Sequence, residues 1–204
     1  MDQPDISAHG VAPISPPAPT GASRLGRLGM VLFLIALGVL FAASMVGYLV
    51  VRLRATTWPP EGSPRLPGGL WVSTAILLVS SLTMHLALGG ARRGQSMVLR
   101  NWLLVTGILG ISFLVSQLLN WSHLITAHHL RAQANLYAFT FYMLTGLHGA
   151  HVVGGLIPLG LTTARASRRR YTPESHEGVV HMSMYWHFLD AVWLVMFVVL
   201  MVAA

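Results

Sequence analysis

The chain alternates between long apolar runs and short stretches that hold almost all of its charge. Four runs contain no Asp, Glu, Lys or Arg: 28–51, 66–91, 101–130 and 132–164. A fifth, 178–204, contains only Asp190. Because about 20 apolar residues cross a bilayer as a helix, each run is long enough to do so. The pattern predicts five transmembrane helices, over Leu28–Val51, Gly69–Ala91, Asn101–Leu119, Asn135–Gly160 and Gly178–Val202.

The composition supports a membrane protein. Of the 204 residues, 54% are hydrophobic and 9% are charged, whereas soluble domains carry about 25% charged residues. Soluble buried helices would need a polar outer face, and these segments have only narrow polar stripes. We therefore expect an all-α fold, a polytopic membrane helical bundle.

The first 23 residues differ from the rest of the chain. Four prolines lie between residues 13 and 19 among Ala, Ser and Gly, and such a segment buries too little to offset the entropy of ordering. We predict a disordered Pro-rich tail over residues 1–23 and one transmembrane domain over residues 24–204. The first apolar run is too long for a typical signal peptide, so we interpret it as a retained anchor.

The arginines predict the orientation, because all 13 basic residues are Arg. With the N-terminus inside, nine of them would be cytoplasmic and four external, so the positive-inside rule favours N-in and C-out. The run Arg168, Arg169 and Arg170 is interpreted as a topology signal that contacts anionic lipid headgroups. The net charge of +7 therefore requires no nucleic-acid partner.

Small residues recur in the fourth predicted helix. Gly146, Ala150 and Gly154 follow one another at intervals of four, which places them on one helix face. Such a face lets a neighbouring backbone approach closely. We predict that these three residues form a helix-packing surface.

Several polar side chains lie inside the predicted helices. An aspartate at the bilayer centre costs roughly 2.5–3.5 kcal/mol, so Asp190 is expected to face protein and to have a partner. His187, one turn earlier, or a histidine of the fourth helix would supply it. We predict buried structural roles for His85, His148, His151, His187 and Asp190.

The ten histidines raise the question of a redox centre, which could depend only on His or Met because the chain has no Cys. His148 and His151 share a helix face and cannot be opposite axial ligands of one haem. No matched pair from two helices stands out. We therefore predict no catalytic, cofactor-binding or metal-binding residue, and a standalone histidine-ligated haem protein remains an alternative.

Longer motifs resemble a known family. The runs FTFYMLTGLHGAHVVGGLI (139–157) and YWHFLDAVWLVMF (185–197) resemble the last two helices of subunit III of the haem–copper oxidases. LPGGLWVSTAILLVSSLTMHLAL (66–88) and GILGISFLVSQLLNWSHL (107–124) are similar to earlier helices of that family. The resemblance covers roughly residues 25–202 and fits the shorter, five-helix bacterial form.

The resemblance implies a non-redox membrane subunit of a cytochrome c oxidase-type terminal oxidase. Such an enzyme reduces O2 to water in aerobic respiratory electron transport and pumps protons, with haem and copper on the partner subunits. It also implies contact with subunit I, mainly, and subunit II, bound phospholipid, and a place in the bacterial plasma membrane. An accessory subunit of a nitric oxide reductase or of a quinol oxidase remains open.

Three positions depart from the family pattern. Leu37, Asn120 and Val180 stand where the family typically has glutamates, the last if His176 is the family's His-x-Gly histidine. Roles that depend on these carboxylates, such as help with proton entry, are therefore not implied for this chain.

Overall fold

The computed structural model describes residues 21–60, 68–128, 131–133 and 135–203. These residues form helices and no strand. The helices are α1 (Gly21–Arg54), α2 (Gly69–Arg92), α3 (Ser96–His128), α4 (Leu136–Ser167) and α5 (Glu177–Ala203). All five are long and apolar enough to cross a membrane, which confirms the five-helix prediction. Of the predicted tail, residues 1–20 lie outside the described residues.

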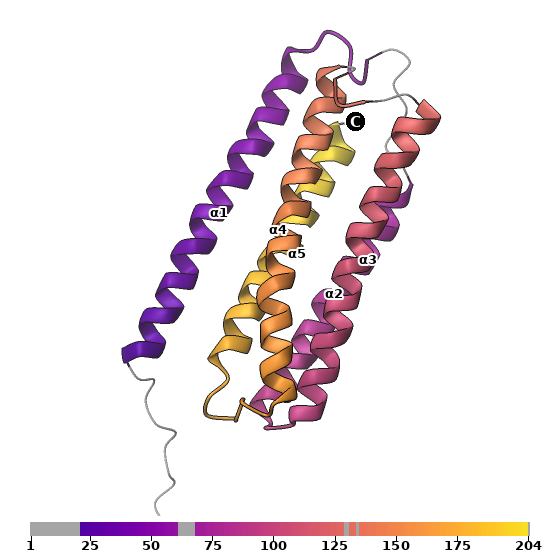
Figure 1. Cartoon of the computed structure of the whole chain (residues 1–204). Helices are drawn as coiled ribbons and strands as arrows, with labels where there is room; N and C mark the ends of the chain where they lie inside the picture. The colour runs from indigo at the N-terminus through magenta and orange to yellow at the C-terminus, as the bar shows by residue number, and fades with distance from the viewer. Residues whose placement is uncertain (1–20, 61–67, 129–130, 134, 204) are drawn as a thin grey trace, which may run out of the picture.

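The helices run alternately up and down, so α1 begins at one end of the bundle and α5 finishes at the other (Figure 1). The most extensive contact is between α2 and α3, and α2 also packs on α5. Helix α4 joins α3 to α5, whereas α1 contacts α4 and α5. The core therefore lies where α2, α3, α4 and α5 meet, with α1 applied to one side.

Two helices extend well past their predicted ends. Helix α3 has 33 residues, about 50 Å at 1.5 Å per residue, against a hydrocarbon core of about 30 Å. Near its end, the Thr126 hydroxyl donates to the Ser122 carbonyl. In α4, which contains Pro158, the Ser167 hydroxyl donates to the Thr163 carbonyl. Polar residues thus extend both helices beyond the predicted spans. The apolar pattern predicts the part of a helix that crosses the membrane, and it does not predict where the helix ends.

A tight turn joins α2 to α3. Gly94 has φ of +68°, in the left-handed region that favours glycine. Its amide donates to the Ala91 carbonyl, and the Gln95 amide donates to the Gly90 carbonyl at 2.9 Å, the pattern of a Schellman helix end. This short connection makes α2 and α3 antiparallel neighbours.

Glycine allows close packing between α4 and α5. A β-carbon at Gly155 would lie 2.5 Å from Cε1 of Tyr185. The Tyr185 ring is held in place because its hydroxyl donates to the His151 carbonyl at 2.8 Å. Gly155 is therefore a position at which only the absence of a side chain permits the observed contact.

The predicted packing face of α4 contains Gly154 and not the neighbouring Gly155, which makes this contact. A β-carbon at Gly146 would come within 3.4 Å of the Trp121 ring, but Ala150 is exposed and Gly154 has open space around it. Ala150 and Gly154 thus lie on a side of α4 that the described residues leave open. Whether they contact another subunit stays a prediction.

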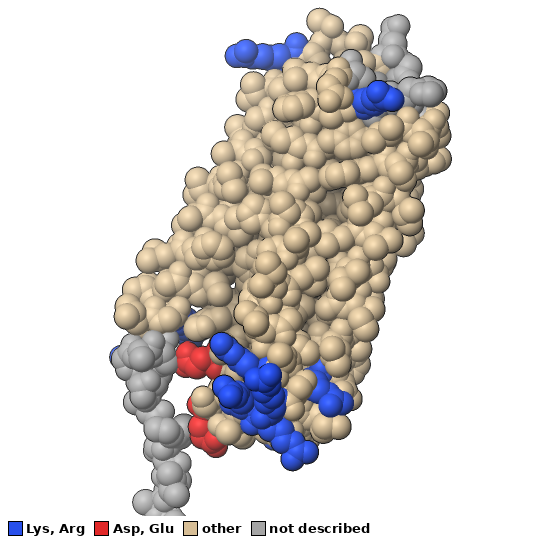
Figure 2. All heavy atoms as spheres, viewed as in Figure 1, with Lys and Arg blue, Asp and Glu red and all other residues tan. Residues whose placement is uncertain are grey.

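On the surface, the charged residues lie at the two ends of the bundle. The face in Figure 2 has no Lys, Arg, Asp or Glu in its middle, and the arginines gather mostly at the end where α1 begins. The same end carries the α2–α3 turn and the α4–α5 connection (Figure 1). Arg168, Arg169 and Arg170, which are predicted to be cytoplasmic, lie in the α4–α5 connection at this end. Large hydrophobic side chains such as Leu32, Ile108 and Ile157 cover the exposed surface between the ends.

The adjacent glycines of α4 give a matched test. We expect Gly155→Ala to lower the free energy of unfolding by about 1–3 kcal/mol, because the methyl group overpacks the α4–α5 contact. Gly154→Ala raises the helix propensity by the same amount, and its methyl group meets no neighbouring atom. It should therefore leave the free energy of unfolding unchanged or raise it. Unfolding of the purified variants in detergent micelles measures both. Equal stabilities would show that the α4–α5 approach at Gly155 is not close.

Candidate functional site

Polar side chains inside the bundle gather along α2, where it faces α3 and α5. Five interhelical hydrogen bonds of 2.7 to 3.0 Å connect α2 to these neighbours. The pairs are Ser73 with Ser116, Thr83 with Thr106, Thr74 with Trp193, Ser80 with Trp186, and Ser81 with His187. Since lipid offers no competing partners, such bonds hold transmembrane helices together. Helix α2 is therefore the polar centre of the bundle.

Asp190 is buried beside one of these bonds. Its Oδ2 lies 3.9 Å from Nδ1 of His187, and that nitrogen is 2.7 Å from the Ser81 hydroxyl oxygen. Oδ2 itself has no hydrogen-bond partner among the described residues. Of the predicted partners, His187 and the histidines of α4, His187 therefore lies nearer to Asp190. The Ser81 hydroxyl, which bonds to His187, was not predicted to take part.

His148 lies at the centre of an aromatic cluster and is completely buried. Its ring centroid is 5.1 Å from that of Trp193, 5.6 Å from Phe113 and 6.2 Å from Phe41. Neither ring nitrogen has a hydrogen-bond partner among the residues that the structure describes. Ring packing, and not hydrogen bonding, therefore surrounds this histidine in the described part of the chain.

His151 is partly buried one turn further along α4. Its Nδ1 is 2.7 Å from the Leu147 carbonyl oxygen of the same helix, and its ring packs edge-on against Phe41 at 5.1 Å. Its own carbonyl accepts the hydrogen bond from Tyr185. His151 therefore connects α4 to both α1 and α5.

His85 differs from the expectation, because its side chain is exposed on α2. The spacing of four from Ser81 puts it on the same side of the helix, where the described residues leave its side chain uncovered. Sequence spacing alone does not reveal this, since it gives a helix face without saying what covers that face.

The three positions that depart from the family pattern are filled by packing residues. Leu37 is buried in α1 and Val180 is partly buried in α5. Asn120 is buried between α3 and α2, where it contacts Gly69 and its Nδ2 donates to the Ser73 hydroxyl at 3.4 Å. The α2–α3 contact thus has an amide at a position where the resemblance implies a carboxylate.

Histidine, aspartate and glutamate do not gather into a metal site in the described part of the chain. No three of these residues lie together as ligands there. The polar contacts instead connect helices to one another.

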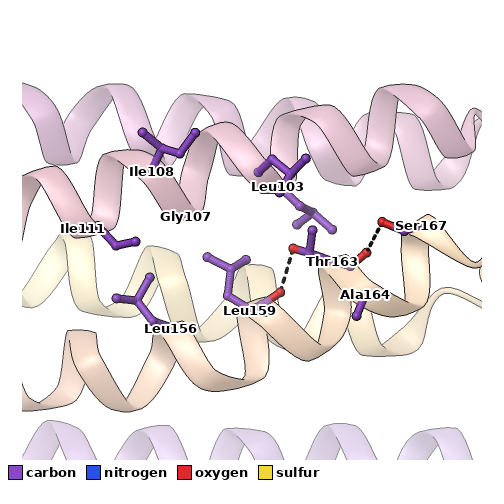
Figure 3. A pocket seen from close by; sticks show the side chains of 11 residues that line it. Leu103, Gly107, Ile108, Ile111, Leu156, Leu159, Thr163, Ala164 and Ser167 are labelled. Atoms are coloured by element: carbon purple, nitrogen blue, oxygen red, sulfur yellow. Dashed lines mark hydrogen bonds between the residues drawn. The ribbon is translucent and has the colours of Figure 1, made fainter.

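An apolar groove of about 440 Å³ runs between α3 and α4. Figure 3 shows Leu103 and Ile111 of α3 facing Leu156 and Leu159 of α4 across it. The Thr163 hydroxyl at its edge already donates to the Leu159 carbonyl. The groove therefore presents a hydrocarbon surface that matches an acyl chain.

A smaller hollow adjoins this groove at the arginine-rich end. It shares Ala164 with the groove and is also lined by Arg165, Arg168 and Arg170. Guanidinium groups bind phosphate oxygens in a bidentate manner. An apolar groove that leads to three arginines is complementary to a molecule with an acyl chain and a phosphate.

Comparison with known proteins points to one family. The family model described as cytochrome c oxidase subunit III matches residues 20–203. The chain is 39% identical over 184 residues to the cytochrome c oxidase subunit 3 of Synechocystis sp., covering 87% of this chain and 76% of that protein. It is 34% identical over 174 residues to the probable cytochrome c oxidase subunit 3 of Mycobacterium leprae, covering 85% of each. With the subunit 3 of Corynebacterium diphtheriae it shares 32% identity over 191 residues, 89% of this chain and 92% of that protein.

Proposed function

Because the chain belongs to the cytochrome c oxidase subunit III family, we propose that it is a non-redox membrane subunit of a cytochrome c oxidase-type terminal oxidase. This enzyme reduces O2 to water and pumps protons. The observation that carries the proposal is the family match over residues 20–203, which includes all five helices. The chain is thus a multi-pass membrane protein of a haem–copper oxidase complex, and its own part is structural.

We place the haem and copper of this oxidase on the partner subunits. The described residues bring no three metal ligands together. The most enclosed histidine, His148, packs against Phe113 and Trp193 rather than beside a second ligand. The polar groups of the interior are used in contacts between helices, which suits a subunit that stabilises its neighbours.

The main contact is proposed to be with oxidase subunit I, and a lesser one with subunit II. The support is the family, because subunit III of a cytochrome c oxidase implies a complex with other oxidase subunits. The apolar outer surface of the bundle is compatible with it, since such a surface packs on an apolar helix as well as on lipid. No nucleic acid is involved, since the arginines lie beside membrane spans, where orientation and anionic headgroups require them.

The location is proposed to be the bacterial plasma membrane, with the N-terminus inside and the C-terminus outside. The arginine-rich end of the bundle supports the orientation, because α1 begins at that end and α5 finishes at the other (Figure 1). The relatives from Synechocystis and Mycobacterium, both bacterial, support the location.

Phospholipid binding is proposed for the groove between α3 and α4. An acyl chain lying along Leu103, Gly107 and Leu159 would fill it, and the phosphate would reach Arg165 and Arg168. The described hydroxyls at its edge donate to backbone carbonyls, so a hydrocarbon chain leaves them satisfied.

Purification of the native complex through a tag on this chain tests the proposed function. We expect subunits that carry haem and copper to copurify, and the isolated chain to give no Soret band. Copurification with a nitric oxide reductase core would move the chain to a different enzyme. Stoichiometric haem on the isolated chain would contradict a non-redox role.

Filling the groove tests the lipid proposal. A β-carbon at Gly107 would lie 3.7 Å from Leu159 Cδ2, so Gly107→Phe should direct its ring into the groove and displace the acyl chain. Gly47→Phe, in open space on α1, is the control. Native mass spectrometry of the complex should show loss of one phospholipid for Gly107→Phe alone. Unchanged lipid in both variants would show that the groove holds none.

A further inference from the structure

The α2–α5 seam exposes polar groups to the membrane interior. His85 is exposed on α2, and the side chain of His187 on α5 is 38% exposed. Ser81, which contacts His187, is only partly buried, and buried Asp190 lies directly behind. We call these four residues the polar seam. The surface helices elsewhere expose mainly aliphatic side chains at comparable depth, as at Val39 on α1 and Ile111 on α3.

The polar seam lies near the middle of the membrane. Asp190 is the central residue of α5, which spans Glu177–Ala203, and Ser81 lies at the centre of α2, which spans Gly69–Arg92. His85 is four residues from Ser81, or about 6 Å along the helix axis. Since the hydrocarbon core is about 30 Å thick, all of these groups lie within it.

Lipid is a poor neighbour for such a surface. Ionisable residues inside a membrane are expensive and face protein or a water-filled cavity. Within the described residues, no hydrogen bond reaches His85, and Oδ2 of Asp190 has no partner. The chain by itself therefore leaves donors and acceptors of the seam unused at the depth where they cost most.

The surroundings of the polar seam fit contact with a helix. On α2, Leu78 and Leu82 are 48% and 58% exposed. They precede His85 by seven and three residues, which places all three on one side of the helix. On α5, the small and exposed residue Ala191 lies four residues after His187, on the same side of the helix. Small and aliphatic residues around a hydrogen-bonding centre are the composition of contacts between transmembrane helices.

We propose that the polar seam docks a transmembrane helix of a partner subunit, which carries a hydroxyl or carboxamide side chain at mid-membrane depth. Such a side chain both donates and accepts, so it satisfies the exposed imidazole of His85 or His187 without bringing a charge into the bilayer. This inference rests on the proposed function, because it needs a membrane complex, but it assigns the contact to one face of the bundle.

Site-specific photo-crosslinking in the assembled complex tests which face is covered. A small diazirine amino acid is placed at Leu82, beside the polar seam, and at the depth-matched control positions Val39 and Ile111, which are 65% and 54% exposed. We expect Leu82 to crosslink to a transmembrane segment of a partner subunit and the controls to crosslink to lipid. Crosslinks from Leu82 to lipid only, or to a second copy of this chain, would overturn the proposal.

Substitution of His85 tests the chemistry of the contact. If a partner side chain is hydrogen-bonded there, His85→Leu should reduce retention of the chain in the purified complex severalfold, and His85→Gln should restore most of it. If lipid covers His85, Leu should be retained as well as the wild type or better, which contradicts the proposal. Failure of the wild-type chain to copurify with any haem-bearing subunit would instead refute the proposed function, so the two failures are distinguishable.

Discussion

Hydrogen bonds between helices are the interaction on which the rest of this structure depends. In lipid, apolar side chains gain little by contacting one another, so helix association relies on close packing and on polar contacts. Helix α2 concentrates those contacts: hydroxyls on its two inner sides bond α3 through Ser116 and Thr106, and α5 through Trp186, His187 and Trp193. These bonds also bear on α4 and α1. Helix α4 packs on α3 and α5, which α2 holds, and α1 packs on α4 and α5.

This constraint explains which features the sequence predicted. The absence of charge over each apolar run predicted five helices, and the cost of a charge in lipid predicted the burial of Asp190. Which helix face meets which neighbour could not be predicted in the same way. Gly154 and Gly155 are adjacent and equally small, yet only Gly155 faces Tyr185. The 3.6-residue period places residues on a face but does not fix the rotation of the helix in the bundle.

The histidines show the same limit. His148 is buried among aromatic rings, whereas His85 is exposed, although both lie in equally apolar sequence. The difference arises from contacts between segments far apart in the chain, such as Phe113 and Trp193 around His148. The outer surface consequently divides into regions of different chemistry: charged ends, an apolar groove beside arginines, and a polar seam at mid-depth. The proposed role, that of a subunit without a redox centre, would depend on such surfaces.

The bond between Ser81 and His187 offers the most direct test that polar contacts hold the bundle together. A double-mutant cycle with Ser81→Ala and His187→Ala, measured as the free energy of unfolding in detergent micelles, isolates the contribution of this pair. We expect a coupling energy of about 0.6 kcal/mol, the average for hydrogen bonds between transmembrane helices, and at most about 1.7 kcal/mol. Strictly additive effects of the two substitutions would contradict the account, because the helices would then be held by packing alone.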